Sequence, residues 1–240
     1  MCRSMRQLQK DKRQERVCVP VVEADLEKAL AAIRKATPLA DLIELRVDYL
    51  KNPELSQLLH NRQKPFIVTN RRREEGGRFQ GDEEARVRIL KEAVRLGVDY
   101  VDIEVSSERS FIQNLMIQKK ARRRGTKVIL SFHDFQRTPS RGDLQKLYDR
   151  MARWGADVVK IVTFARSWED NLNVLGLIPH ARERGQKITA FCMGEEGRMS
   201  RVMAPLLGGT WTYASLSRHK VSAPGQMTPG EMRRVWEGLR

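Results

Sequence analysis

One lysine stands inside an otherwise aliphatic segment of the chain. Residues 156–163 read ADVVKIVT, so Lys160 interrupts a run of β-branched side chains that is typical of a buried parallel strand. Burying an ammonium group is costly, and such a lysine either loses its proton or acquires a carboxylate partner. A neutral lysine in a desolvating pocket is a nucleophile towards carbonyl carbon. The segment alone leaves open the alternative that Lys160 ends the strand and reaches solvent.

A histidine stands at the end of the predicted strand that precedes the lysine. His133 directly follows residues 127–132, which read KVILSF. Imidazole accepts and donates protons near neutral pH, so we expect His133 to act as acid and base, with a pKa near the working pH. A lone histidine is more often structural, and that is our interpretation of the three others, which fall on predicted helices or in a loop: His60, His180 and His219.

Charged residues alternate with aliphatic ones along two further predicted strands. The period of two places Glu44, Arg46 and Asp48 on one face, and Asp102 and Glu104 share a face in the same way. Because helices are expected to cover the outside of the sheet, these charges must point inward. Inward charges are costly unless they are paired, so they indicate either a ligand site or a satisfied ionic network in the core.

Three predicted loops or helix starts carry groups suited to a polar ligand. Arg71 precedes the glycines of residues 76–77, and its planar guanidinium fits a carboxylate or a phosphate. Arg201 lies on a predicted helix, where it can pair with a small anion. Ser222 and Gln226 belong to the sequence SAPGQ, which we expect to act as a lid. Each of these segments is also compatible with a simple connection.

Strand and helix signals alternate along nearly the whole chain. Eight such pairs predict an α/β fold, a (β/α)8 TIM barrel in a single domain, in which chemistry gathers at the carboxyl ends of the strands. A doubly wound open sheet is the alternative, but the sequence contains no G-x-G-x-x-G fingerprint. We expect a flexible extension at 1–16 and a barrel over 17–240. The predicted strands are 17–22, 42–47, 66–69, 100–105, 127–132, 157–163, 187–192 and 211–216, and the predicted helices lie near 24–36, 53–61, 82–96, 108–124, 141–154, 168–184, 198–206 and 228–238.

The composition narrows the setting in which the protein works. The 240 residues are 40% hydrophobic, enough for a sizeable core, and no apolar run approaches the length of a membrane span. The first sixteen residues lack the apolar segment of a signal peptide. The odd number of cysteines (Cys2, Cys18 and Cys192) indicates a reducing compartment, so we expect a cytoplasmic protein. No cluster of cysteine and histidine has zinc-site spacing.

The net charge of +15 needs an explanation, which is either an anionic binding partner or a highly solvated basic surface. Nucleic-acid binding is one interpretation, because basic surfaces attract phosphate. However, lysine and arginine are spread along the chain and aromatic residues make up only 6%, which leaves few platforms for base stacking. An anionic substrate or a solvated basic surface accounts for the charge equally well, so we expect no nucleic-acid partner and no membrane partner.

Six short motifs occur in an order that resembles the type I 3-dehydroquinate dehydratase family, over roughly residues 17–238. They are E-x-R-x-D (Glu44 to Asp48), T-x-R-x-x-x-E-G-G (Thr69 to Gly77), S-F-H (Ser131 to His133), V-K-I (Val159 to Ile161), M-G-x-x-G-x-x-S-R (Met193 to Arg201) and S-A-P-G-Q (Ser222 to Gln226). Each motif alone is weak evidence. All six fall at the carboxyl end of a predicted strand, which makes the combined resemblance specific.

The resemblance implies a barrel, usually a homodimer, that eliminates water from 3-dehydroquinate to give 3-dehydroshikimate in the shikimate pathway, with no metal and no cofactor. By the same resemblance, Lys160 forms an imine with the substrate ketone. His133 assists imine formation, removes the α-proton and protonates the leaving hydroxyl, while Glu75 orients His133 and tunes its basicity. Arg201 holds the substrate carboxylate. The residues that the resemblance assigns to the substrate hydroxyls and to closing the site are Glu44, Arg46, Arg71, Ser222 and Gln226.

The sequence departs from the family at one position, and one other enzyme class shares its main signal. Some family members carry a hydroxyl residue near the end of the first strand, where this chain has Pro20. The basic extension and the pI near 10.2 are not explained by the family either. Class I aldolases and transaldolases also place a Schiff-base lysine in this barrel, usually with a phosphate site. The S-A-P-G-Q loop and the E-x-R motif favour the dehydroquinate family.

Overall fold

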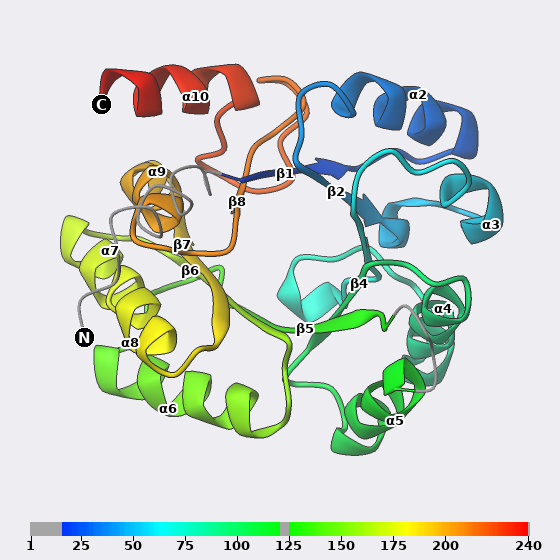
Figure 1. Cartoon of the computed structure of the whole chain (residues 1–240), viewed down its shortest axis with the longest axis horizontal. Coiled ribbons are helices and arrows are strands. Elements are labelled where there is room, and N and C mark those ends of the chain that lie inside the picture. Colours follow the sequence, from blue (N-terminus) through cyan, green and yellow to red (C-terminus); the bar gives the residue numbers. More distant parts are fainter. Residues whose placement is uncertain (1–15, 121–124, 240) are drawn as a thin grey trace, which may run out of the picture.

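Eight parallel strands form a nearly closed barrel in the computed structural model, which describes residues 16–120 and 125–239 (Figure 1). The hydrogen-bonded order is β7-β6-β5-β4-β3-β2-β1-β8. The backbone amide of Thr210 donates to the carbonyl of Ile188 at 2.7 Å and joins the two edges of the sheet. The strands are β1 (Val17–Val21), β2 (Leu42–Arg46), β3 (Phe66–Thr69), β4 (Tyr100–Glu104), β5 (Lys127–His133), β6 (Val158–Phe164), β7 (Lys187–Met193) and β8 (Thr212–Tyr213).

Helices surround the barrel and cover its outer face (Figure 1). Several helices begin at a residue whose side-chain oxygen accepts a hydrogen bond from a backbone amide of the first turn, as at Asp82 and Thr228. The helices are α2 (Leu26–Ala36), α3 (Leu55–Leu58), α4 (Glu83–Arg95), α5 (Arg109–Lys120), α6 (Arg141–Arg153), α7 (Trp168–Leu175), α8 (Leu177–Glu183), α9 (Arg198–Leu206) and α10 (Pro229–Gly238), with short 3-10 turns η1 (Val47–Tyr49) and η2 (Arg73–Glu75). The fold is therefore the predicted (β/α)8 barrel.

Three predicted elements differ in the structure. The helix predicted at 168–184 is two helices, because Pro179 has no amide to donate to the carbonyl one turn before it. The helix predicted at 53–61 is reduced to the single turn of α3. The strand predicted at 211–216 ends after two residues, since the amide of Ser215 turns away to the carbonyl of Met227.

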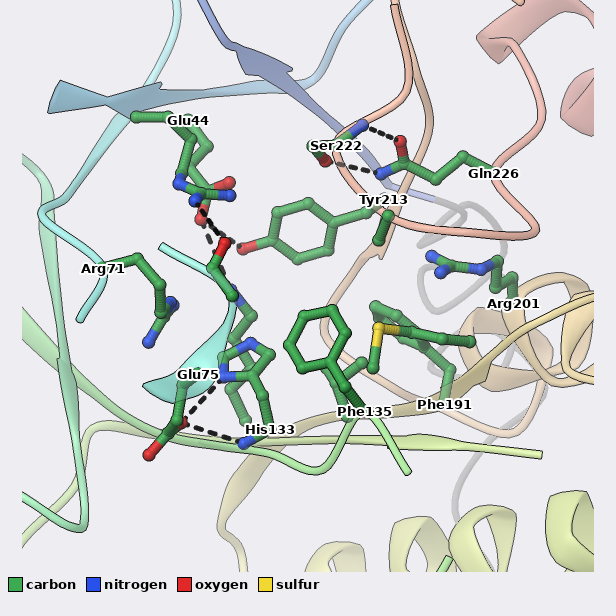
Figure 2. A pocket seen from close by; sticks show the side chains of 16 residues that line it. Glu44, Arg71, Glu75, His133, Phe135, Phe191, Arg201, Tyr213, Ser222 and Gln226 are labelled. Atoms are coloured by element: carbon green, nitrogen blue, oxygen red, sulfur yellow. Dashed lines mark hydrogen bonds and ion pairs between the residues drawn. The ribbon is translucent and has the colours of Figure 1, made fainter. Parts of the chain in front are cut away.

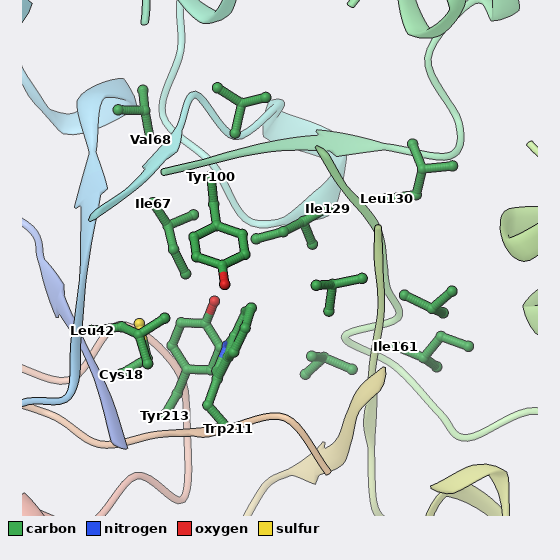
Figure 3. Close-up of a cluster of buried hydrophobic side chains, with 14 of the residues drawn as sticks. Cys18, Leu42, Ile67, Val68, Tyr100, Ile129, Leu130, Ile161, Trp211 and Tyr213 are labelled. Atoms are coloured by element: carbon green, nitrogen blue, oxygen red, sulfur yellow. The ribbon is translucent and has the colours of Figure 1, made fainter. Parts of the chain in front are cut away.

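The barrel interior changes from apolar to charged along the strands. Near the amino ends, the rings of Tyr100 and Trp211 pack edge to face with centroids 5.4 Å apart, within a buried apolar layer (Figure 3). The members of that layer include Cys18, Leu42, Ile67, Tyr100, Ile129 and Trp211. Two residues further along each strand the same inward face carries Glu44, Thr69, Asp102, Ser131 and Tyr213. The polar side chains thus gather towards the carboxyl ends of the strands, where barrel enzymes place their sites.

The structure says little about two predictions, the extension at residues 1–16 and the absence of a membrane span. The extension predicted at 1–16 lies outside the described residues, except for Arg16. Within residues 16–120 and 125–239, no helix combines the length and the apolar content that a membrane span requires. Both described cysteines, Cys18 and Cys192, are buried free thiols.

Candidate active site

All nine site residues predicted from the sequence line one cavity at the carboxyl ends of the strands (Figure 2). The space between its walls, including the part open to solvent, is about 450 Å³. The predicted residues that line it are Glu44, Arg46, Arg71, Glu75, His133, Lys160, Arg201, Ser222 and Gln226. Seven further residues that sequence reasoning did not assign to the site complete the wall: Gly76, Phe135, Val162, Phe191, Met193, Tyr213 and Ala223. Five of these lie near the carboxyl end of a strand or just after it, which was the available signal in the sequence.

Lys160 is held inside the barrel by two carboxylates. Its side chain is only 5% exposed, and Nζ lies 3.0 Å from Asp102 and 3.3 Å from Glu44. Nζ also lies 4.5 Å from the centroid of the Tyr213 ring, where an ammonium or iminium is attracted by the ring face. The alternative of a solvent-facing lysine at the end of a strand is therefore wrong. Lys160 is placed where a ligand in the cavity meets it.

His133 and Glu75 form a pair beside the lysine strand. The backbone amide of His133 donates to Glu75 Oε2 at 3.0 Å, and the same oxygen lies 3.1 Å from Nδ1 of the imidazole. The hydroxyl of Ser106 donates to the other oxygen of Glu75 at 2.6 Å. Because the carboxylate accepts the proton of Nδ1, Nε2 carries the lone pair, and it has no hydrogen-bond partner within the described part of the chain. The imidazole is thus set up as a base.

The fold places Glu75 against the histidine through a tight turn at the end of β3. A Cβ on Gly77 would stand 1.9 Å from the carbonyl oxygen of Arg71, so only glycine lets the chain fold back at this point. The short turn η2 then carries Glu75 over the barrel. The glycine pair noted in the sequence thus serves backbone packing that positions Glu75.

The protonation of this pair differs from the sequence-based expectation. Burial raises the pKa of Glu75 to about 7, and the nearby charge of Arg71 offsets the burial only in part. Burial, followed by the charges of Arg71 and Lys160, lowers the pKa of His133 well below its usual value. The expectation of a histidine pKa near the working pH is therefore wrong. The imidazole is neutral at physiological pH, and the pair takes up its first proton near pH 7.

Arg71 is fully engaged with acidic groups on β4. Its Nη2 donates to Asp102 at 2.8 Å, and Nη1 donates to Glu104 at 2.9 Å and to the hydroxyl of Ser131 at 2.7 Å. Burial would lower the pKa of Arg71, but Asp102 and Glu104 raise it well above its usual value. In the same way burial would raise the pKa of Asp102, yet Arg71 and Lys160 hold it well below its usual range. These groups stay charged.

The charged residues of β2 do not pair with each other. Arg46 donates twice to Asp48, with both distances at 2.8 Å, and Asp48 lies in the turn η1 rather than on the strand. Glu44 instead accepts the hydroxyl of Thr69 at 2.9 Å and contacts Lys160 across the barrel. The inward charges of β2 are therefore paired, as in the ionic-network alternative, and both Glu44 and Arg46 also line the cavity.

Arg201 is a buried cation without an acidic partner in the described residues. Its side chain is fully buried, and its only hydrogen bond in that part of the chain runs from Nη2 to the carbonyl of Pro224 at 3.0 Å. Nε and Nη1 have no partner there, and the guanidinium lies 4.6 Å from the centroid of Phe191. Burial lowers the pKa of Arg201 to about 9, so it remains charged at neutral pH. An anion in the cavity would satisfy these donors.

The S-A-P-G-Q loop closes the cavity on the side of Arg201 (Figure 2). Ser222 and Gln226 bond each other twice, from the Ser222 amide to Oε1 at 2.8 Å and from Nε2 to the Ser222 hydroxyl at 3.0 Å. The loop packs tightly on the segment after β7, because a Cβ on Gly225 would stand 2.1 Å from the carbonyl of Gly194. Two polar side chains are thereby presented to the cavity.

The fold and the cavity together define a class of protein. It is a (β/α)8 barrel that carries a buried lysine, a histidine–carboxylate pair and an arginine with no acidic partner among the described residues, all around one cavity. Nucleophile, base and anion binder are separate groups, so the arrangement suits covalent catalysis on a carbonyl compound that bears a carboxylate. Within the described ranges, no three His, Cys, Asp or Glu side chains are arranged to hold a metal ion.

Comparison with known proteins identifies the family. Residues 17–239 match the family model of type I 3-dehydroquinase. The 3-dehydroquinate dehydratase of Desulfotalea psychrophila is 37% identical over 221 residues, which cover 92% of this chain and 96% of that protein. The enzyme of the same name from Thermococcus gammatolerans is 42% identical over 219 residues, covering 90% and 94%. The chain belongs to the type I 3-dehydroquinase family, which sets aside the class I aldolase interpretation.

The fold agrees with solved structures of the family. The crystal structure of 3-dehydroquinate dehydratase from Geobacillus kaustophilus superimposes with a TM-score of 0.85 at 28% identity, covering 94% of this chain and 91% of that one. The superposition thus includes nearly the full length of both chains.

Proposed function

We propose that this protein removes water from 3-dehydroquinate to give 3-dehydroshikimate, through an imine on Lys160. One observation carries the proposal. In a chain of the type I 3-dehydroquinase family, the buried lysine, the histidine base and an anion-seeking arginine line a single cavity. The product is an intermediate of aromatic amino acid biosynthesis, and the reaction is that of a hydro-lyase.

The proposed chemistry uses the lysine as an electron sink. Nζ of Lys160 adds to the ketone carbon, and loss of water gives an iminium ion. The iminium acidifies the adjacent carbon, from which Nε2 of His133 removes a proton. The C–H electron pair forms a C–C double bond, and the π pair of the C–N double bond moves onto nitrogen to give an enamine. The nitrogen pair then re-forms the C–N double bond, the C–C double bond shifts by one position, and the C–O bond breaks as the protonated imidazole gives its proton to the leaving hydroxyl. Hydrolysis of the imine returns the free lysine.

The proposed binding mode follows from the charges around the cavity. Arg201 holds the substrate carboxylate, because its free donors face no competing acid in the described residues. Glu75 fixes the tautomer of His133 and raises its basicity through the 3.1 Å contact. The hydroxyls of the substrate meet the polar groups at the rim and the loop, which are Glu44, Arg46, Arg71, Ser222 and Gln226.

The function is tested by turnover and the lysine by trapping. Incubation with 3-dehydroquinate should give the ultraviolet absorbance of the conjugated product. Borohydride added with substrate or product should fix ligand mass to the protein, and peptide mapping should place it on Lys160. Lys160→Arg keeps the charge but cannot form an imine, so it should lose both adduct and turnover. An adduct on another lysine would refute the assignment, and absent turnover would refute the function.

We also propose that the protein is a cytoplasmic homodimer and that residues 1–16 are a separate extension on a barrel of residues 17–240. The two buried free thiols support a reducing compartment. Sedimentation at several concentrations should show a dimer. A chain that begins at Arg16 should keep its turnover rate, and a loss of activity would mean that the extension belongs to the barrel.

A further inference from the structure

Arg86 is a buried arginine on an outer helix. It lies on α4, yet it is only 1% exposed. Nε and Nη2 each donate to Glu83 at 2.8 Å, and Nη2 also donates to the hydroxyl of Ser107 at 2.8 Å. Nη1 donates to the carbonyl of Asn70 at 2.7 Å and lies 2.7 Å from Glu104 Oε2. The guanidinium thus makes four hydrogen bonds and one close ion pair, which restrict its orientation.

Glu104 connects this helix arginine to the cavity. One of its carboxylate oxygens pairs with Arg86, and the other accepts Nη1 of Arg71 at 2.9 Å and the backbone amide of Arg72 at 3.1 Å. Glu104 is fully buried at the end of β4. Without Arg86, Oε2 of Glu104 would have no cationic partner in the described residues, and the contact between Oε1 and Arg71 would change.

The backbone before Arg71 is tied to the same helix residue. The carbonyl of Asn70 accepts Nη1 of Arg86, and the side-chain amide of Asn70 donates to the backbone carbonyl of Arg86 at 3.1 Å. Arg86 therefore restrains the segment after β3 at two points. It contacts Asn70 directly, and it contacts the side chain of Arg71 through Glu104. These contacts reach the cavity wall from outside the barrel.

We infer that Arg86 is a positioning residue for the reaction: through Glu104 and Asn70 it holds Arg71 in the orientation that receives the substrate. The inference rests on the proposed function, in which Arg71 contacts the substrate. Arg86 itself is not among the residues that line the cavity. Its effect must pass through the two groups that it holds.

The same contacts couple Arg86 to the base. Glu104 raises the pKa of Glu75, with burial the larger cause. Removal of the Arg86 charge leaves Glu104 less neutralised, so the Glu75–His133 pair should hold its proton to higher pH. The other charged groups around that pair are Arg71, Lys160, Asp102 and Arg46, and none of them changes in the variants below.

The experiment compares Arg86→Met and Arg86→Lys with Arg88→Met, an exposed arginine on the same helix. Active sites are counted by borohydride trapping, and assays run well below each Tm. Arg86→Met should raise KM for 3-dehydroquinate about tenfold and move the acidic limb of kcat/KM to higher pH. Arg86→Lys should raise KM but leave the acidic limb of kcat/KM at the same pH. Lysine retains the positive charge but lacks the planar guanidinium that holds Glu104 and Asn70 together. Arg88→Met should change neither.

Two additions keep the inference open to refutation. If Arg86→Met does not fold, Glu83→Gln loosens the same arginine from a partly exposed side chain and should give a smaller rise in KM. NMR titration of His133 needs no turnover, and it should show a higher pKa in Arg86→Met than in wild type. An unchanged KM, pH profile and titration in these variants would overturn the inference. A wild-type protein without turnover but with the titration shift would refute only the proposed function.

Discussion

At the scale of single residues, the cavity contains two buried arginines in opposite electrostatic settings. Arg71 is surrounded by carboxylates and is neutralised before any ligand arrives. Arg201 has only a carbonyl and a ring face in the described residues. A substrate carboxylate therefore gains most at Arg201, where it supplies the missing countercharge. The first arginine shapes the site and the second attracts the anion.

Replacement of Arg201 by methionine should separate binding from stability. Loss of a charge-assisted contact to the substrate carboxylate costs about 2–4 kcal/mol, or roughly 30- to 1000-fold in kcat/KM, mainly through KM. Without substrate, the Tm of Arg201→Met should be no lower than that of wild type. The substitution removes a buried charge that has no acidic partner in the described residues, while methionine keeps the contact with Phe191. Steady-state kinetics and thermal melting measure the two effects. Unchanged kcat/KM would place the anion elsewhere, with Arg71 the next candidate.

Replacement of Glu75 by glutamine should shift the pH profile downward. In wild type the pair takes up a proton as the pH falls through about 7, and the occupied base no longer accepts a proton from carbon. In Glu75→Gln the negative charge is gone, so His133 alone is protonated only at lower pH. The acidic limb of kcat/KM should therefore move to lower pH, with the borohydride adduct retained. Glu74→Gln, at an exposed neighbouring carboxylate, is the control and should leave the limb in place.

At the scale of elements, the loop between β8 and α10 and the segment after β7 form one closing device. Gly225 has φ of +78°, and a side chain there would meet the carbonyl of Gly194. The same contact region holds Pro224, whose carbonyl accepts the only hydrogen bond that Arg201 makes within the described residues. Closure of the loop and orientation of the anion-binding arginine are thus coupled.

A Gly225→Ala substitution should hold this loop away from the segment after β7. The left-handed φ and the 2.1 Å approach both oppose a Cβ, so Ser222 and Gln226 should lose their place over the cavity. We expect KM to rise about tenfold while the barrel itself stays folded. The control is Gly125→Ala, where a Cβ meets open space. Equal KM in the two variants would show that loop closure does not contribute to binding.

At the scale of the whole molecule, the buried charges are nearly balanced while the chain carries +15. Inside the barrel, cations such as Lys160 and Arg71 face carboxylates such as Asp102 and Glu104. The excess positive charge therefore lies mostly outside this network. Such a charge raises the local concentration of anionic substrates at low ionic strength.

This predicts a salt dependence of substrate capture. Between about 0.05 M and about 0.5 M salt the Debye length shortens severalfold, so kcat/KM should fall about two- to fivefold while kcat changes little. Stopped-flow or initial-rate kinetics at constant pH measure this. A kcat/KM that does not depend on salt would mean that the net charge serves another partner, for which retention on DNA at low salt is the direct test.

The amino-acid sequence by itself determined the order of the elements and which end of the barrel is chemical. Periodicity decides which face a residue occupies, so the positions of Glu44, Lys160 and His133 on inward faces or strand ends followed from spacing alone. The short eighth strand shows the limit, since the hydrogen bond from the Ser215 amide to the distant carbonyl of Met227 ended it early. The helix break near Pro179, by contrast, follows from a local property of proline.

Only the tertiary structure decided which charges meet. Glu44 bonds to Lys160, 116 residues away, rather than to its neighbour Arg46, because the partner is set by the register and tilt of the strands across the barrel. The same holds for Arg201, whose lack of an acid depends on every side chain around it. It also holds for Arg86, an arginine on an outer helix that sequence reasoning did not single out. Helical spacing places Arg86 on the same buried face of α4 as Val87 and Leu90, but only the fold brings Glu104 at the end of β4 to it.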